Sequence, residues 1–200
     1  MSAAGSDAAG TLASVSAAIL LGGASSRMGT DKAQLTYEGM SYAGRISKRL
    51  GNLFEQVYLV GGEAPADALG QQVADEAGPR CPLRGLVSVL EVARSERVLL
   101  LATDMPMITP ELVLALVAWP EADVVLPRTD FGLQPLCAIY HRERVLPCAR
   151  RALEEDRLSL HGLLDECSIS VLGVDELRKV DPEERALLNV NTPEDRERLQ

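Results

Sequence analysis

A run of glycines, a hydroxyl group and two cations follows the first apolar stretch of the chain. Gly22 and Gly23 come first, Ser25 adds the hydroxyl, and Arg27 and Lys32 add positive charge. Because glycine lacks a Cβ atom and tolerates positive φ, consecutive backbone N–H groups there can turn toward one anion. A guanidinium fork and a flexible ammonium group then neutralise phosphate charge. These residue types and their spacing predict a loop that grips the phosphates of a nucleotide.

Two common phosphate loops do not match this spacing. A Walker loop that starts at Gly23 needs glycine at position 28 and lysine at position 29, where the chain has Met28 and Gly29. The dinucleotide pattern G-x-G-x-x-G, started at Gly22, needs glycine at position 24, where the chain has Ala24. The spacing therefore argues against a P-loop and against a nicotinamide or flavin site.

A second candidate site follows the strongest apolar run, residues 97–102. Asp104 stands directly beyond this predicted strand, and ligands of parallel sheets bind at the carboxyl ends of the strands. A carboxylate is a hard anionic ligand of the kind that Mg²⁺ uses together with substrate phosphates. The alternative is a structural role, in which Asp104 caps the turn before Pro106.

The glycine loop resembles the signature L-x-G-G-x-S-x-R-M-G-x-D-K-A of the molybdenum cofactor guanylyltransferase family. Four further segments resemble motifs of that family: D-x-P at Asp104, P-L-x-G at residues 82–85, Q-P-L-x-A-x-Y at residues 134–140, and N-V-N-T-P-E-D at residues 189–195. Together the matches cover most of residues 17–199. The alternative is a glycine-rich turn between a strand and a helix, with no role in binding.

The resemblance implies a role for each matching residue. Lys32, Arg27 and Asp104 would act in catalysis, with Mg²⁺ held on Asp104. Asp75 would recognise guanine, because a carboxylate can accept from N1–H and from the exocyclic amine together; the alternative is a solvated surface loop at Asp75. The residues expected to bind the nucleotide or acceptor are Leu20, Leu21, Gly22, Gly23, Ser25, Lys32, Asp75, Asp104, Asn189 and Asn191.

The implied reaction transfers GMP from GTP to the terminal phosphate of molybdenum-bound molybdopterin and releases pyrophosphate. The expected partners are GTP, the molybdopterin-type cofactor, and an adaptor or apo-molybdoenzyme that receives the product. The alternatives are a cytidylyltransferase acting on the same cofactor, a sugar-1-phosphate nucleotidyltransferase, and a non-enzymatic nucleotide-binding adaptor.

One position departs from the family pattern. After the predicted strand at residues 57–60 the family often carries an asparagine that faces the nucleotide, and this chain has Gly61 and Gly62. Backbone groups of the two glycines could substitute, because they allow close approach of the main chain. At this position the chain therefore lacks the asparagine side chain that the family often has.

Apolar runs predict strands at residues 17–21, 57–60, 98–102, 123–126, 136–140 and 169–174. Helical patterns predict helices at residues 41–53, 85–93 and 110–117, the last with Thr109 as N-cap and Pro110 at its first position. This alternation favours an α/β fold, a Rossmann-like three-layer α/β/α sandwich with a mainly parallel sheet. The resemblance places it in the nucleotide-diphospho-sugar transferase type. Residues 1–16 are predicted to be a flexible tail and residues 17–200 a single domain.

Composition supports an enzyme that works on small molecules. The net charge of −9 and the pI near 4.8 argue against nucleic acid as a partner, since such binding needs a basic face. The four cysteines, at positions 81, 137, 148 and 167, form no C-x-x-C pair, and indicate reduced thiols and no zinc site. With no signal peptide and no apolar span of about 20 residues, we expect no membrane association and a cytoplasmic location.

Overall fold

The computed structural model describes residues 12–22, 35–75, 77–183, 185–190 and 195. The strands of the main sheet are β1 (Val15–Leu21), β4 (Val57–Gly61), β5 (Gln71–Val73), β6 (Arg97–Ala102), β7 (Val124–Thr129), β8 (Gly132–Leu133), β9 (Cys137–His141) and β10 (Ile169–Leu172). Strands β2 (Thr36–Tyr37) and β3 (Met40–Ser41) form a separate ribbon. The helices are α2 (Tyr42–Gly51), α3 (Pro82–Val92), α4 (Pro110–Ala118), α5 (Arg142–Glu154), α6 (Leu160–Leu164) and α7 (Val174–Val180).

The main sheet has the strand order β10-β7-β9-β6-β1-β4-β5, with β8 paired to β7. Strands β5, β4, β1 and β6 run parallel to one another, and β10 runs parallel to β7. Strand β9 is antiparallel to both of its neighbours, β6 and β7. The start of β9 therefore lies at the edge where β6 and β7 end.

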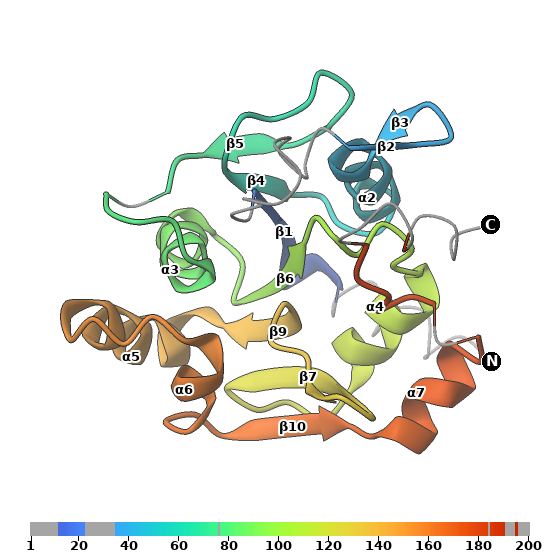
Figure 1. Cartoon of the computed structure of the whole chain (residues 1–200). Coiled ribbons are helices and arrows are strands. Elements are labelled where there is room, and N and C mark those ends of the chain that lie inside the picture. Colours follow the sequence, from blue (N-terminus) through green and yellow to red (C-terminus); the bar gives the residue numbers. More distant parts are fainter. Residues whose placement is uncertain (1–11, 23–34, 76, 184, 191–194, 196–200) are drawn as a thin grey trace.

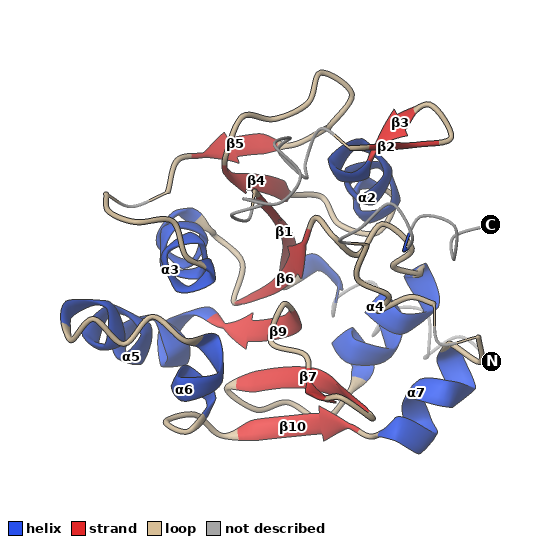
Figure 2. Ribbon diagram, viewed as in Figure 1, coloured by secondary structure: helices blue, strands red, loops and turns tan. Residues whose placement is uncertain are grey.

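Helices cover both faces of the sheet (Figures 1 and 2). Helices α2, α4 and α7 lie on one face, and α3, α5 and α6 lie on the other. Alternate residues of β1 enter the two cores: Ile19 packs with the first group of helices, and Leu20 with the second. This alternation follows from the twofold period of a strand. The predicted three-layer α/β/α sandwich with a mainly parallel sheet is confirmed.

Most of the predicted elements are present with small shifts at their ends. Helix α4 begins as expected, because Thr109 Oγ1 accepts from the amide of Leu112 at 3.3 Å and Pro110 occupies its first turn. Helix α3 begins three residues earlier than expected, at Pro82, a residue well suited to a first helical position. The last predicted strand was too long: β10 ends at Leu172, and α7 starts at Val174.

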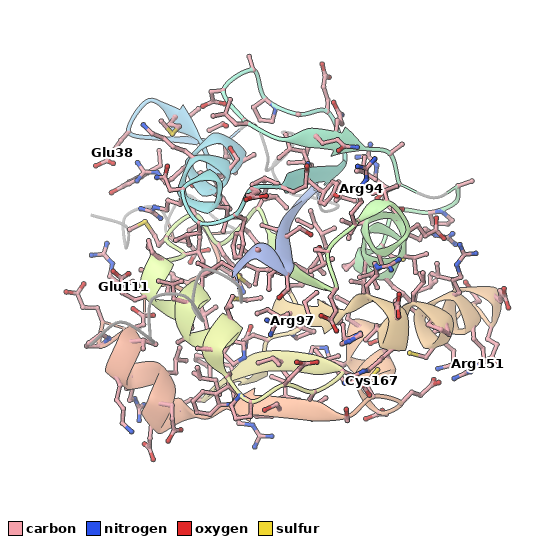
Figure 3. All side chains as sticks on the ribbon, turned by 180° about the vertical axis from the view of Figure 1, so that it is seen from behind. Glu38, Arg94, Arg97, Glu111, Arg151 and Cys167 are labelled. Atoms are coloured by element: carbon pink, nitrogen blue, oxygen red, sulfur yellow. The ribbon has the colours of Figure 1, made fainter. Side chains whose placement is uncertain are left out.

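The chain joins the sheet earlier than predicted. Strand β1 begins at Val15, and both Val15 and Ser16 are buried. Val15 pairs with Arg97, whose backbone N–H donates to the carbonyl oxygen of Ser14 at 3.1 Å. The Arg97 side chain is 7% exposed and lies inside the molecule, whereas Glu111 lies at its rim (Figure 3). The prediction of a tail over residues 1–16 is therefore wrong for its last residues, because pairing with β6 fixes them.

The cysteines are all free thiols. The Sγ atoms of Cys148 and Cys167 lie 3.8 Å apart, and burial raises the pKa of Cys167 to about 12, so this thiol stays protonated. The imidazole of His141 faces Glu96 at 3.3 Å and Glu121 at 3.9 Å. Among the described helices, none is long and apolar enough to cross a membrane.

Candidate functional site

The end of β1 is anchored on both sides. Leu20 lies opposite Ala102, and its carbonyl oxygen accepts from the buried Thr103 hydroxyl at 2.9 Å. On the other side, the backbone N–H of Gly62 donates to the carbonyl oxygen of Leu21 at 3.3 Å. Cross-links to β6 and β4 therefore fix the point where the glycine loop begins.

A cavity of about 350 Å³, here called the Asp75 cavity, opens where β1, β4 and β5 end. It lies between the strand ends and the start of α3. Its lining residues are Leu20, Leu21, Gly22, Val60, Asp75, Arg80, Cys81, Pro82 and Gly85. This is the crevice at the carboxyl ends of the strands in which α/β sheets bind ligands.

Two glycines make room for the Asp75 carboxylate. Gly61 has φ +84°, and a Cβ atom there would lie 2.8 Å from Oδ2 of Asp75 and 3.1 Å from the carbonyl oxygen of Leu21. A Cβ atom on Gly85 would lie 2.5 Å from Cδ2 of Leu20 and 3.4 Å from Oδ1 of Asp75. A side chain at either position would displace the carboxylate or the cavity wall. The shape of the cavity therefore depends on Gly61 having no side chain.

The Asp75 carboxyl group is half-buried and lies near two cations. Burial raises the pKa of Asp75, while the charges of Arg80 and Arg84 act in the opposite direction. The Arg84 guanidinium group donates to the carbonyl oxygens of Ala77 at 2.7 Å and Pro79 at 3.0 Å, and so holds the segment between Asp75 and α3. Asp75 is thus a partly desolvated carboxyl group on a braced segment, suited to accept hydrogen bonds from a ligand.

Asp104 follows β6, one strand along the sheet from β1. It is half-buried, and its carbonyl oxygen accepts from the backbone N–H of Val190 at 2.8 Å. This bond brings the segment at residues 187–190, which carries Asn189, next to the end of β6. A carboxylate oxygen of Asp104 and an amide oxygen of Asn189 are both hard oxygen donors of the type that Mg²⁺ accepts.

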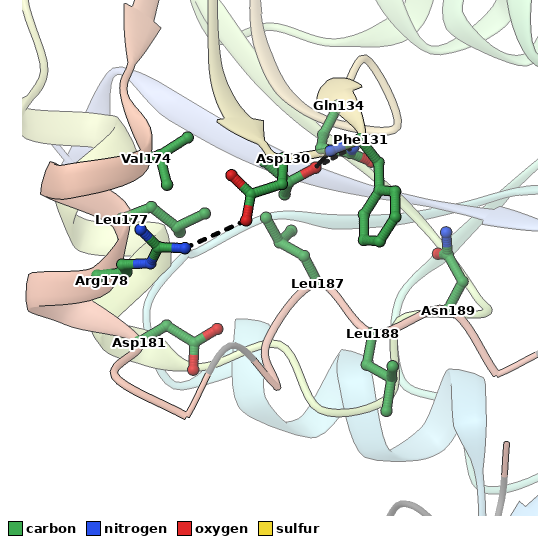
Figure 4. A pocket seen from close by; sticks show the side chains of 11 residues that line it. Asp130, Phe131, Gln134, Val174, Leu177, Arg178, Asp181, Leu187, Leu188 and Asn189 are labelled. Atoms are coloured by element: carbon green, nitrogen blue, oxygen red, sulfur yellow. Dashed lines mark hydrogen bonds and ion pairs between the residues drawn. The ribbon is translucent and has the colours of Figure 1, made fainter.

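A second cavity of about 300 Å³, here called the Phe131 cavity, is drawn in Figure 4. By the strand order it lies on the other side of β6 from the Asp75 cavity. It is formed by the β7–β8 hairpin, by α7 and by the segment that follows α7. Its lining residues are Thr129, Asp130, Phe131, Gln134, Val174, Leu177, Arg178, Asp181, Leu187, Leu188 and Asn189. The buried Asp181 carboxylate accepts from the backbone N–H groups of Arg185 at 3.2 Å and Ala186 at 2.8 Å, which fixes the start of the last segment.

The structure places the predicted site residues in three groups. Leu20, Leu21, Gly22 and Asp75 line one cavity, Asn189 lines the other, and Asp104 lies just beyond the end of β6, the strand between them. The remaining predicted residues, which are Gly23, Ser25, Arg27, Lys32 and Asn191, lie outside the described residues.

The sequence prediction left out Arg80 and the residues of the hairpin. Arg80 follows a proline and glycine turn and gave no signal beyond its charge. The hairpin signal was present in Thr129-Asp130-Phe131-Gly132, where an aromatic residue stands in a short polar turn before Gln134. The prediction used only the motif that begins at Gln134.

Residues 17–168 match the model of the MobA-like NTP transferase domain. Among curated proteins, the chain is similar to a probable molybdenum cofactor guanylyltransferase of Chloroflexus aggregans. The two are 33% identical over 196 residues, which cover 90% of this chain and 91% of the relative.

Two solved structures have a similar fold. Molybdopterin-guanine dinucleotide biosynthesis protein A of Archaeoglobus fulgidus matches with a TM-score of 0.79 and 22% identity, over 92% of this chain and 95% of that one. The 2-C-methyl-D-erythritol 4-phosphate cytidylyltransferase of Thermus thermophilus matches with a TM-score of 0.67 and 14% identity, over 91% of this chain and 95% of that one. At these identities the likeness establishes the fold only, and the same fold occurs in proteins named for guanine and for cytosine nucleotides.

Proposed function

This chain belongs to the MobA-like NTP transferase family, and on that basis we propose that it is a molybdenum cofactor guanylyltransferase. The reaction joins GMP from GTP to the terminal phosphate of molybdenum-bound molybdopterin. The observation that carries the proposal is the half-buried Asp75 carboxyl group. It occupies the space left by Gly61 and Gly85, in a cavity beside the first residue of the glycine loop. The identity of the acceptor is taken from the relatives, which are named as molybdenum cofactor guanylyltransferases.

The base of GTP binds in the Asp75 cavity. Guanine presents two neighbouring donors, N1–H and the exocyclic amine, and a carboxylate can accept from both. Cytosine offers no such pair on one edge. The asparagine often found after β4 in the family is replaced by Gly61, and the role of this glycine is to admit the Asp75 carboxylate close to the main chain.

Asp104 would hold Mg²⁺, and Asn189 would add an oxygen, since the next residue, Val190, donates to the carbonyl oxygen of Asp104. The donor chemistry fits a hard divalent cation. When bound, Mg²⁺ supplies positive charge to the phosphates during transfer. Residues beyond the described part of the chain complete the site: the glycine-loop N–H groups, Ser25, Arg27 and Lys32 bind the triphosphate, and Asn191 lies two residues beyond Asn189.

The chemistry is a phosphoryl substitution without a protein nucleophile. A terminal phosphate oxygen of the acceptor attacks the α-phosphorus of GTP, the bond from that phosphorus to the bridging oxygen breaks, and pyrophosphate leaves with the electron pair. Both reactants are anionic, so the protein accelerates the reaction by positioning them and by stabilising charge. Lys32 and Arg27 neutralise the triphosphate in this scheme.

The direct test incubates the protein and Mg²⁺ with GTP radiolabelled at the α-phosphate and with molybdenum-loaded molybdopterin. The proposal requires label in a guanine dinucleotide and an equal amount of pyrophosphate. If CTP donates and GTP does not, the chain is a cytidylyltransferase. If neither nucleotide donates, the adaptor function replaces the proposal.

The base contact has its own test, in which calorimetry compares GTP with ITP, whose base lacks the exocyclic amine. One hydrogen bond to a carboxylate makes GTP bind about ten- to a hundredfold more tightly than ITP. Asp75→Ala should remove this difference, while Glu154→Ala, an exposed acidic residue at the end of α5, should leave it intact. An unchanged difference in Asp75→Ala would place the base elsewhere.

Delivery of the product to an adaptor or to an apo-molybdoenzyme, and a cytoplasmic site of action, belong to the same proposal.

A further inference from the structure

The tip of the β7–β8 hairpin presents an aromatic ring to solvent. The Phe131 side chain is 99% exposed, more than any other large apolar side chain among the described residues. Removing apolar surface from water is favourable, so a ligand that covers this ring gains binding free energy. The hairpin therefore presents a surface that a ligand can cover.

The hairpin that carries this ring is held by several hydrogen bonds. The Gln134 side-chain amide donates to Thr129 Oγ1 at 3.0 Å and to the carbonyl oxygen of Gly132 at 3.2 Å. The backbone N–H of Phe131 also donates to Thr129 Oγ1, at 3.2 Å. At the neighbouring position, Asp130 pairs with Arg178 of α7 at 3.1 Å. The backbone under the ring is therefore fixed, which lowers the entropy cost of using the ring as a binding surface.

The ring faces the cavity. In Figure 4 the phenyl group of Phe131 projects toward the segment at residues 187–189, between Leu187 and Asn189. The segment that forms the opposite wall is hydrogen-bonded to Asp104. The backbone N–H of Val190, the residue after Asn189, donates to the carbonyl oxygen of Asp104 at 2.8 Å. The wall opposite Phe131 therefore adjoins Asp104, the residue proposed to hold Mg²⁺.

We propose that Phe131 stacks on the planar ring system of the acceptor, a pterin, and that the Phe131 cavity is the acceptor seat. This inference rests on the proposed function and adds the residue that recognises the acceptor. A guanine dinucleotide contains two flat heterocycles joined through a pyrophosphate. The sheet offers two cavities on opposite sides of β6, with Asp104 between them.

Polar groups at the rim of the cavity can orient the stacked ring system of the acceptor. The Asp130–Arg178 pair and the exposed Asn189 amide surround the space that the ring faces. Aromatic stacking accepts any flat heterocycle, whereas hydrogen bonds at the rim select among them. Phe131 therefore contributes affinity for a pterin, and the rim determines its orientation.

The test uses Phe131→Ala and Phe131→Trp, with Leu69→Ala as a matched control that removes another exposed apolar side chain, 64% exposed and outside both cavities. Loss of one stacked ring is worth about ten- to a hundredfold in binding. We expect Phe131→Ala to raise the KM for molybdenum-loaded molybdopterin by that factor and to leave the KM for GTP unchanged. Phe131→Trp should retain the wild-type value, and so should Leu69→Ala.

A second readout does not depend on the transfer reaction. Quenching of pterin fluorescence measures binding of metal-free molybdopterin directly, and binding should weaken in Phe131→Ala alone. This result would support the inference even if the donor proved to be CTP, in which case only the guanine assignment fails. Normal molybdopterin binding by Phe131→Ala, or an equal rise in both KM values, would overturn the inference while leaving guanylyl transfer intact.

Discussion

The two cavities beside β6 are walled in different ways. Backbone shapes the Asp75 cavity: Gly61 and Gly85 leave the space that the carboxylate fills, and strand ends form its floor. Side chains shape the Phe131 cavity, which takes its walls from an exposed hairpin and from α7. A cavity walled by backbone tolerates little change, whereas one walled by exposed side chains can be altered without disturbing the sheet. In the proposed function, the nucleotide binds in the first cavity and the acceptor binds in the second.

The largest effect is expected at the residue between the cavities. Asp104→Ala should lower kcat by about 10²–10³-fold, because it removes the proposed ligand of the Mg²⁺ ion that would stabilise negative charge in the transition state. Pyrophosphate release measures this loss, and Glu154→Ala on the far end of α5 serves as control. Near-normal turnover in Asp104→Ala would show that Asp104 takes no part in transfer between the two cavities.

The backbone character of the Asp75 cavity can be tested with a matched glycine pair. Gly61 and Gly39 both have positive φ, so alanine at either should cost about 1–2 kcal/mol in the free energy of unfolding. Only at Gly61 would the new Cβ meet Asp75, since nothing lies within 4 Å of one at Gly39.

Gly61→Ala should therefore lower kcat/KM for GTP by about ten- to a hundredfold, while Gly39→Ala keeps the wild-type value. Urea unfolding and steady-state kinetics on both variants provide the comparison. Equal kinetics in the two variants would show that Gly61 serves only the turn.

The turn that carries Asp104 has its own support, from Arg49 of α2. Its Nη1 atom donates to the carbonyl oxygens of Pro106 at 2.8 Å and Ile108 at 2.9 Å, and burial lowers the pKa of Arg49. Arg49→Met should lower the free energy of unfolding by about 1–3 kcal/mol and reduce kcat modestly, with both KM values unchanged. Lys48→Met, an exposed neighbour on the same helix, should alter neither. If the KM for only one substrate changed, the turn would support only the cavity that binds that substrate.

The smallest expected effect is on stability, at Asp75. Burial raises its pKa in the folded protein, so the fold disfavours the ionised form, and that penalty is present above the folded pKa. Asp75→Asn removes the charge and should unfold at slightly higher urea concentration than wild type at pH 7. The gain should shrink as pH falls toward the ordinary carboxyl value of 3.8. If the gain in stability stayed constant with pH, its cause would not be the ionisation of Asp75.

Local sequence patterns predicted the core of this fold well and its edges poorly. The buried apolar runs at β1, β4 and β6 were located within two residues, because strands covered on both faces read as continuous apolar segments. Strand β5 was missed, since Gln71-Gln72-Val73 is short and mostly exposed at the sheet edge. The antiparallel direction of β9 depends on how the chain returns between β6 and β7, which no local pattern reports.

The candidate site shows the same division. Asp75, Asp104 and Asn189 were predicted from motifs as site residues, and the structure shows where they lie relative to β6. The packing of Gly61 against the Asp75 carboxylate was not predictable, because the two residues are 14 positions apart in the chain. Phe131 and Arg178 meet at one cavity only through tertiary packing of the hairpin on α7.

The central claim is that each cavity serves one substrate, and the most direct test measures both KM values in Asp75→Ala and Phe131→Ala. The account predicts a crossed pattern: Asp75→Ala raises the KM for GTP alone, and Phe131→Ala raises the KM for molybdenum-loaded molybdopterin alone. If both variants raise the same KM, the two cavities do not divide the substrates and the account is wrong.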